Sequence, residues 1–140
     1  MGRILAIDYG TKRTGIAVTD PLRIIPGGLT TVPTHTLLDF LTGYFGKEEV
    51  DVIVVGYALN MDGRESASMK QIRPFTERLK KLFPDKRIEM YDERFTSVIA
   101  QKAILEAGVK KMARRNKALV DEVSACIILE SYLESNRNSL

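Results

Sequence analysis

The chain has 140 residues, 44% of them hydrophobic, a length and composition typical of one folded domain around a single core. Its net charge of +3 permits an anionic partner such as nucleic acid without requiring one. The only cysteine, Cys126, excludes an internal disulfide framework and a zinc site with several cysteines, and the only histidine, His35, leaves no His-rich ligand set to propose. No apolar run approaches the ~20 residues that cross a bilayer, so we expect a cytoplasmic protein without membrane contact.

The first part of the chain predicts three sequential antiparallel strands. Residues 3–8 (RILAID) and 14–19 (TGIAVT) are β-branched-rich runs on either side of a glycine-containing turn, a pattern typical of a hairpin. A third run, Leu29 to Val32, follows a Pro-Gly-Gly turn. These strands predict a meander.

The middle of the chain predicts a βαβ arrangement. Apolar spacing indicates a helix over residues 36–45, followed by a strand over 51–56 (DVIVVG) that is apolar on both faces. A second helix is expected over 65–83, with a kink or break at Pro74, and a strand over 87–91.

The last part of the chain predicts two helices joined by a basic segment. The first covers residues 97–107, the basic segment is 110–117 (KKMARRNK), and the last helix ends near Leu133. We therefore expect one domain over residues 1–134 and a frayed tail over 135–140.

Asp8 ends the first apolar strand and is followed at once by a turn that contains Lys12 and Arg13. A carboxylate at such a place is costly unless something positive meets it. Either Asp8 pairs with one of these two basic residues or caps the hairpin in an Asx turn, or it holds a cation.

A second acidic position lies in YDERFTS, residues 91–97, where the adjacent pair Asp92 and Glu93 ends a strand. Strand alternation sends the two side chains to opposite faces, so at most one of them is expected to join Asp8. A bulge at the strand end could change the facing, so the pattern leaves the choice open. A structural role for Glu93, in pairing with Arg94 or capping the next helix, also stays open.

The third acid is Asp121, in LVDEVSACIILESYLES. Ala125, Ile128 and Tyr132 follow it at helical spacing, so Asp121 falls within an apolar stripe, whereas Glu122 lies elsewhere around the helix. An acid that faces inward usually has a hydrogen-bond partner or a metal ion. If the three acidic positions converge, their oxygen ligands suit Mg²⁺, with Mn²⁺ as a substitute, and metal-assisted cleavage of a phosphodiester.

Four motifs in order, IDYGTKRTGIAVTD, VVGYALNMDGRES, YDERFTS and DEVSACIILESYL, resemble the bacterial YqgF family, also called RuvX, over nearly the whole chain. This family is described as Holliday junction resolvases and as pre-16S rRNA processing nucleases. The resemblance implies an α/β, RNase H-like three-layer fold with a mixed central sheet, its first three strands antiparallel, and helices on both faces. It also implies that Asp8, Glu93 and Asp121 are the catalytic and metal-binding set, and that the glycines of the first hairpin and the NMDG loop border the substrate groove. Whether Asp92 or Glu122 assists in metal binding stays open.

Basic residues flank this expected site. The residues that we expect to contact nucleic acid are Lys12, Arg13, Asn60, Arg94, Arg114 and Arg115. The segment from Lys70 to Phe83 is also basic, and we interpret it as an exposed helix face. The sequence has no aromatic RNA-binding motif or zinc finger, so recognition is expected to depend on backbone shape.

Three functions follow from this pattern. The first is a hydrolase, a Mg²⁺-dependent endonuclease that processes the 5′ end of pre-16S rRNA on a ribosomal precursor particle, as a monomer or weak homodimer. The second is a resolvase of four-way DNA junctions, which would need a stable dimer to cut two strands symmetrically. The third is a non-catalytic RNA-binding assembly factor. DYGTKRTG also resembles the phosphate loop of the sugar kinase and actin superfamily, but one lobe of 140 residues is too short for that two-lobed architecture.

Overall fold

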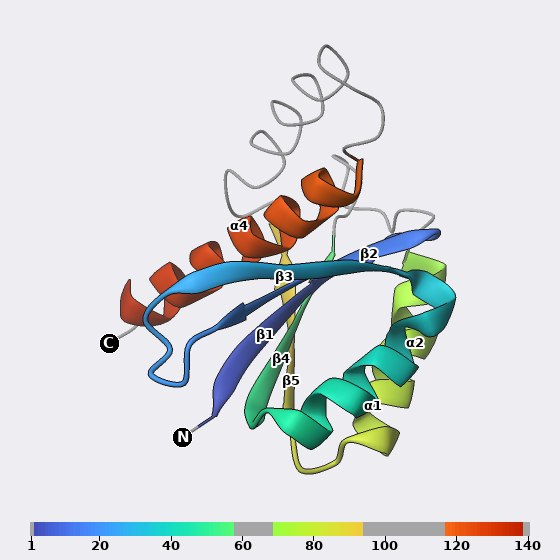
Figure 1. Cartoon of the computed structure of the whole chain (residues 1–140), viewed down its shortest axis with the longest axis horizontal. Helices are drawn as coiled ribbons and strands as arrows, with labels where there is room; N and C mark the ends of the chain where they lie inside the picture. Colours follow the sequence, from blue (N-terminus) through green and yellow to red (C-terminus); the bar gives the residue numbers. More distant parts are fainter. Residues whose placement is uncertain (1, 58–68, 94–116, 139–140) are drawn as a thin grey trace.

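The computed structural model describes residues 2–57, 69–93 and 117–138, which form a five-stranded mixed sheet with helices on both faces (Figure 1). The sheet order is β3-β2-β1-β4-β5. The strands are β1 (Arg3–Asp8), β2 (Arg13–Thr19), β3 (Pro26–Pro33), β4 (Val50–Tyr57) and β5 (Arg87–Asp92). The helices are η1 (Thr34–Thr36, a 3₁₀ turn), α1 (Leu37–Lys47), α2 (Met69–Leu82) and α4 (Lys117–Asn138).

The pairing of the strands decides where the site can lie. Strands β1, β2 and β3 are antiparallel to one another in sequence order, as predicted, whereas β4 is parallel to both β1 and β5. The carboxyl ends of β1, β4 and β5 therefore meet at one edge of the sheet, the edge at which open α/β sheets bind their ligands.

The sheet buries one apolar cluster on each face. Helix α4 covers one face, where it packs on Ile4, Ala6 and Val54, while α1 and α2 cover the other, where they pack on Ile7 and Ile53 (Figure 1). Strands β1 and β4 contribute alternate residues to the two clusters, which explains why their sequences are apolar on both faces. The predicted three-layer arrangement is confirmed.

Strand β3 begins three residues earlier than predicted, because the Pro-Gly-Gly segment pairs with β2. Pro26 is opposite Thr19, and the register shifts between Ile16 and Ala17, which lies opposite Gly28. An edge strand tolerates a proline at its first position and a glycine at a bulge. The Pro-Gly-Gly sequence therefore predicted a turn in a segment that is paired with β2.

Two helices also differ from their predicted form. Helix α2 continues through Pro74, where the sequence predicted a kink or break, and the exposed proline lies in the first half of the helix. Helix α4 continues to Asn138, beyond the predicted end near Leu133. The expected start of α2 at residue 65 and the expected helix over 97–107 lie outside the described residues. Across the described ranges, no helix has the length and apolarity needed to cross a bilayer.

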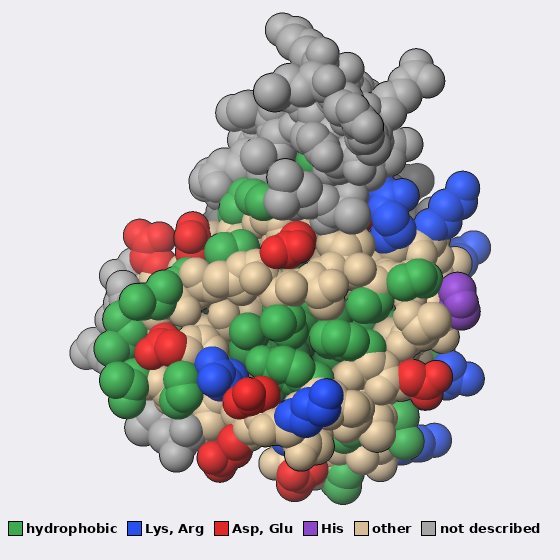
Figure 2. Space-filling model, in the orientation of Figure 1, with side chains coloured by type: hydrophobic (Ala, Val, Ile, Leu, Met, Phe, Trp, Pro, Cys, Tyr) green, Lys and Arg blue, Asp and Glu red, His purple; other side chains and the backbone are tan. Residues whose placement is uncertain are grey.

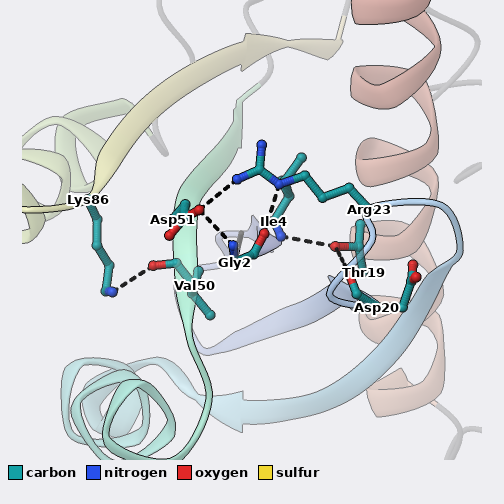
Figure 3. Close-up of polar contacts among 8 residues, drawn as sticks. All are labelled: Gly2, Ile4, Thr19, Asp20, Arg23, Val50, Asp51 and Lys86. Atoms are coloured by element: carbon teal, nitrogen blue, oxygen red, sulfur yellow. Dashed lines mark hydrogen bonds and ion pairs between the residues drawn. The ribbon is translucent and has the colours of Figure 1, made fainter.

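A polar network fastens the opposite edge of the sheet, at the amino ends of β1 and β4 (Figure 3). Asp51 Oδ2 accepts hydrogen bonds from Gly2 N at 2.7 Å and from Arg23 Nη2 at 2.8 Å, and Arg23 Nε donates to the Gly2 carbonyl at 2.8 Å. Lys86 Nζ donates to the carbonyl of Val50 at 2.7 Å. Asp51 thus holds the amino terminus and Arg23 to β4, so its role is structural.

Candidate active site at the carboxyl edge of the sheet

Asp8 is the last residue of β1, at the carboxyl edge of the sheet. It lies opposite Gly15 of β2 on one side and Gly56 of β4 on the other. Ala6, two residues earlier, belongs to the cluster beneath α4, so alternation gives Asp8 the α4 face as well. Because these two neighbours have no side chain, α4 can approach the sheet closely on that face.

The choice between Asp92 and Glu93 follows from the packing of β5. Met90 faces α2, where its sulfur lies 3.7 Å from Thr76 Oγ1, whereas Tyr91 faces α4 and contacts the ring of Tyr132 at a centroid distance of 6.3 Å. Alternation therefore places Asp92 on the α2 face, and extended one residue beyond the strand it places Glu93 on the α4 face, with Asp8. Both carboxyl residues are buried, Glu93 at 3% exposure.

Helix α4 brings the third acid to the same edge. A Cβ built on Gly15 would overlap the backbone carbonyl of Asp121, so the helix backbone rests directly on β2 at this point. Because Gly15 is also the register partner of Asp8, the close approach places Asp121 beside the end of β1. The apolar stripe predicted below Asp121 is confirmed, since Ala125, Ile128 and Tyr132 are all buried.

Arg13, at the start of β2, has an ion pair within this group. Its Nε donates to Asp121 Oδ2 at 2.7 Å, with the side chains 43% and 24% exposed, respectively. One of the residues expected to contact nucleic acid thus binds a carboxylate that was expected to bind metal. A guanidinium and a divalent cation would compete for this oxygen.

Glu122 lies away from the site. Its carboxylate covers Gly28 of β3, where a Cβ would overlap it, and in the sheet order β2 separates β3 from the β1 strand of Asp8. This agrees with its position around the helix in the sequence. Glu122 is therefore excluded as a direct neighbour of Asp8.

The donor chemistry of Asp8, Glu93 and Asp121 fits Mg²⁺, which prefers carboxylate oxygens and retains several waters and substrate oxygens as its other ligands. Among residues 2–57, 69–93 and 117–138, however, the side chains form no ready cluster of three or more acidic, His or Cys ligands. The backbone brings the three acids to one edge and one face, whereas Asp121 points its oxygen at Arg13.

Most of the expected nucleic-acid contacts cannot be placed. Asn60, Arg94, Arg114 and Arg115 lie outside the described residues. Lys12 lies in the β1–β2 turn, where its side chain is exposed.

Two further residues shape the site, and of these the sequence pointed only to the first, as a glycine of the first hairpin. Gly15 sets the approach of α4, and Thr34 holds the β1–β2 turn: its Oγ1 donates to the Gly10 carbonyl at 2.7 Å and its N donates to the Lys12 carbonyl at 2.9 Å. The glycine in TGIAV was a signal for the first. Nothing local in the sequence marks the second, because its partners lie more than twenty residues away in the chain.

Comparison with known proteins finds relatives that match nearly the whole chain. A family model described as RuvX, Holliday junction resolvase, matches residues 2–135. A protein of Porphyromonas gingivalis with the name "Putative pre-16S rRNA nuclease" is 65% identical over 135 residues, which cover 96% of this chain and 98% of the relative. Proteins of the same name from Phocaeicola vulgatus and Flavobacterium johnsoniae are 60% and 51% identical, each over 98% of this chain and 99% of the relative.

Proposed function

The chain belongs to the RuvX family, and from this membership we propose that it is a metal-dependent endonuclease that processes the 5′ end of pre-16S rRNA. The family has the RNase H-like fold, to which the mixed sheet with helices on both faces corresponds. Relatives that match almost the entire chain carry the name of a pre-16S rRNA nuclease, which supports both the chemistry and the substrate.

The observation that carries this proposal is the close contact between the α4 backbone at Asp121 and Gly15 of β2. This one contact places Asp121 against the strand position that pairs with Asp8. Glu93 reaches the same face from β5 by alternation. Three acids from distant parts of the chain thus share one edge of the sheet.

In the proposed reaction, Asp8, Glu93 and Asp121 would hold Mg²⁺, for which Mn²⁺ would substitute. Such an ion would supply activation of the attacking water and stabilisation of the leaving oxygen of the phosphodiester. Lys12 and Arg13, in and beside the β1–β2 turn, hold the phosphate backbone of the substrate beside these acids. The substrate is pre-16S rRNA in a ribosomal precursor particle, and a monomer suffices for cutting one strand.

The test is cleavage of a labelled 16S rRNA precursor with Mg²⁺ or Mn²⁺ by the unmodified protein and by Asp8→Asn. Loss of one metal ligand removes several kcal/mol of transition-state stabilisation, so we expect the rate to fall by about 100-fold or more. The matched control is Asp85→Asn, an exposed acid in the connection to β5 at the opposite edge, which should leave the rate unchanged. Circular dichroism checks that both variants fold.

If the folded protein binds this RNA without cutting it under any metal condition, the nuclease proposal fails and a non-catalytic assembly factor takes its place. If Asp8→Asn cuts as fast as the unmodified protein, the assignment of the carboxylates fails.

A second candidate function is cleavage of four-way DNA junctions, which the description of the matching family model favours. The chemistry would be the same, but symmetric cutting of two strands requires a stable dimer. The same cleavage assay with a four-way junction, together with sedimentation at working concentration, separates the two. A stable dimer that cuts the junction faster than the rRNA precursor would establish the second function.

A further inference from the structure

A pocket of about 510 Å³ lies on the other face of the sheet from the candidate carboxylates. The β1–β2 turn forms one wall with Tyr9 and Thr11, η1 contributes Thr34 and His35, and α2 forms the opposite wall. This volume is within the range of about 300–1,000 Å³ that is usual for ligand sites. The pocket takes no part in the proposed chemistry, which leaves its own role to be explained.

The charge of the pocket is positive. Lys70 and Arg78 both line it from α2. They are at positions i and i+8, with Pro74 between them at i+4, so all three lie on one face of the helix. None of the described lining residues is acidic. In Figure 2 the histidine, which is His35, lies among Lys and Arg side chains along one edge of the molecule. Such a wall attracts phosphate.

The pocket also has an aromatic side. The ring of Tyr9 lies 4.9 Å from that of Phe75, between ring centroids, at an interplanar angle of 37°. Phe75 is buried, at 7% exposure, and Tyr9 is half-buried above it. Burial raises the pKa of the Tyr9 hydroxyl, and the charge of Arg78 opposes this rise. Proteins that bind single strands combine these two features, a cationic wall and an aromatic ring for a base.

The wall formed by the turn is rigid before any ligand arrives. Thr34 Oγ1 lies 2.9 Å from Thr14 Oγ1 and also bonds the Gly10 carbonyl, while a Cβ on Gly10 would overlap the Arg13 carbonyl. These contacts hold the turn in the shape that forms the wall. A preformed site loses less entropy when it binds.

The pocket and the candidate active site are adjacent along the chain. Asp8 and Tyr9 are consecutive, and they face opposite sides of the sheet: Asp8 shares the face of α4, and Tyr9 packs with the cluster beneath α1 and α2. A nucleic-acid strand that crosses this edge would meet both.

We propose that the pocket binds one nucleotide of the single-stranded part of the substrate, with its phosphate on Lys70 and Arg78 and its base on Tyr9. This inference rests on the proposed function, because the strand in the pocket is the one that continues to the carboxylates. The basic face of α2 is thereby a binding surface rather than an exposed face without a role.

The first test measures binding of a labelled single-stranded RNA by fluorescence anisotropy in EDTA, where no metal supports cleavage. The double variant Lys70→Ala, Arg78→Ala should weaken binding by about tenfold or more. It should also reduce the slope of log affinity against log salt by about 0.7, the contribution of the one phosphate on a single strand that the two side chains hold. Tyr9→Leu should weaken binding about tenfold with the salt slope unchanged, because stacking is not ionic.

The matched control is Lys80→Ala, Lys81→Ala, which removes the same charge from exposed positions of α2 outside the pocket lining. It should change the affinity by less than about threefold. Equal weakening by the two double variants would overturn the proposal, since it would show a general charge effect.

The second test uses His35, the only histidine in the chain and a lining residue, as a reporter in proton NMR. A short single-stranded RNA should shift its ring signals at concentrations at least tenfold below those needed of uridine 5′-monophosphate or inorganic phosphate. Unmoved signals at saturating RNA would overturn the proposal. Equal affinity for RNA and for the mononucleotide would also overturn it and assign the pocket to a free nucleotide.

These outcomes are independent of the cleavage assay. If no RNA is cut but the pocket variants still lose binding and the His35 signals still move, the nuclease proposal fails and the pocket stands. If Asp8→Asn abolishes cleavage while the pocket variants bind normally, the pocket fails and the nuclease stands.

Discussion

The carboxylate of Asp121 has two competing roles, ion pairing with Arg13 and the proposed binding of a metal ion. The 2.7 Å contact is partly exposed, and ion pairs of that kind contribute only about 0–1 kcal/mol to stability. A contact this weak can be displaced by a divalent cation at a modest cost. Arg13 would then be available for a phosphate. It would thus pair with Asp121 in the absence of metal and with the substrate in its presence.

This competition predicts the behaviour of Arg13→Gln. Without the guanidinium, Asp121 carries no competing partner from β2, so the variant should bind Mn²⁺ several-fold more tightly in isothermal titration calorimetry. The affinity for RNA should fall in the same variant, because a phosphate contact is lost.

Lys12→Gln is the control for this prediction, since it removes the same charge from the neighbouring position. It should weaken RNA binding with little change in Mn²⁺ affinity. If both variants tighten Mn²⁺ binding equally, the effect is one of overall charge and the competition for Asp121 is refuted.

At the scale of elements, the decisive contact is that of α4 with the glycines of the sheet. Gly15, Gly28 and Gly56 lie on three different strands, and a Cβ on any of them would overlap an atom of α4. At Gly56 that atom is the end of the Ile128 side chain, which can move, whereas at Gly15 it is the backbone of Asp121. A Cβ at Gly56 could therefore be accommodated by movement of a side chain, whereas a Cβ at Gly15 would require the helix backbone to move.

Gly15→Ala should destabilise the protein by about 3 kcal/mol, because forced overpacking of a close contact costs about 1–3 kcal/mol and a backbone contact lies at the upper end. Chemical denaturation measures this change. The displaced helix would also carry Asp121 away from Asp8, so cleavage should fall in the folded fraction.

Gly27→Ala is the matched control on β3, since a Cβ there would meet nothing within 4 Å. Its effect should stay within about 0.5 kcal/mol. A Gly15→Ala variant as stable as Gly27→Ala would mean that α4 does not rest on β2 as the structure has it.

At the scale of the whole molecule, the network around Asp51 joins the amino terminus, the β2–β3 loop and β4 (Figure 3). Arg23 reaches it from that loop in a left-handed conformation with φ of 60°. The loop is held by Asp20, whose Oδ1 accepts bonds from Ile24 N at 2.8 Å and Ile25 N at 2.7 Å. The network lies at the edge opposite the candidate active site, so it stabilises the fold without touching the chemistry.

The network predicts how stability depends on pH. The hydrogen bond from Gly2, and then the charge of Arg23, lower the pKa of the Asp51 carboxyl, so its ionised form is favoured by folding. That contribution is fully present above the unfolded-state pKa of about 3.9 and is lost as the pH falls through the lower folded-state pKa. Urea denaturation at pH 7, 5, 4 and 3 should show stability falling below about pH 4.

Asp51→Asn should be less stable than the unmodified protein at pH 7 and should lose less on acidification. Asp85→Asn, which replaces an acidic side chain that is itself 78% exposed, serves as the control and should follow the unmodified curve. Parallel curves for Asp51→Asn and the unmodified protein would exclude Asp51 as a source of the acid sensitivity.

Much of this protein is determined by its sequence alone. Alternation and helical spacing predicted β1, β4, β5 and α1 to within one or two residues. This was possible because the apolar pattern that determines each of these elements lies within the element's own sequence. The resemblance of four motifs predicted the family and the RNase H-like fold, and both are confirmed. The roles of Asp8, Glu93 and Asp121 stay predictions.

The tertiary structure alone decided what depends on residues that are far apart in the chain. The facing of Asp92 and Glu93 required the packing of β5 between α2 and α4, and the pairing of Arg13 with Asp121 spans 108 positions. The pocket beside Tyr9 is formed by the β1–β2 turn, η1 and α2, and Thr34 of η1 bonds the turn at Gly10, 24 positions away in the chain. The local sequence pattern indicates which face of its element a residue lies on. The register of the strands and the packing of a helix decide which other residues it contacts on that face.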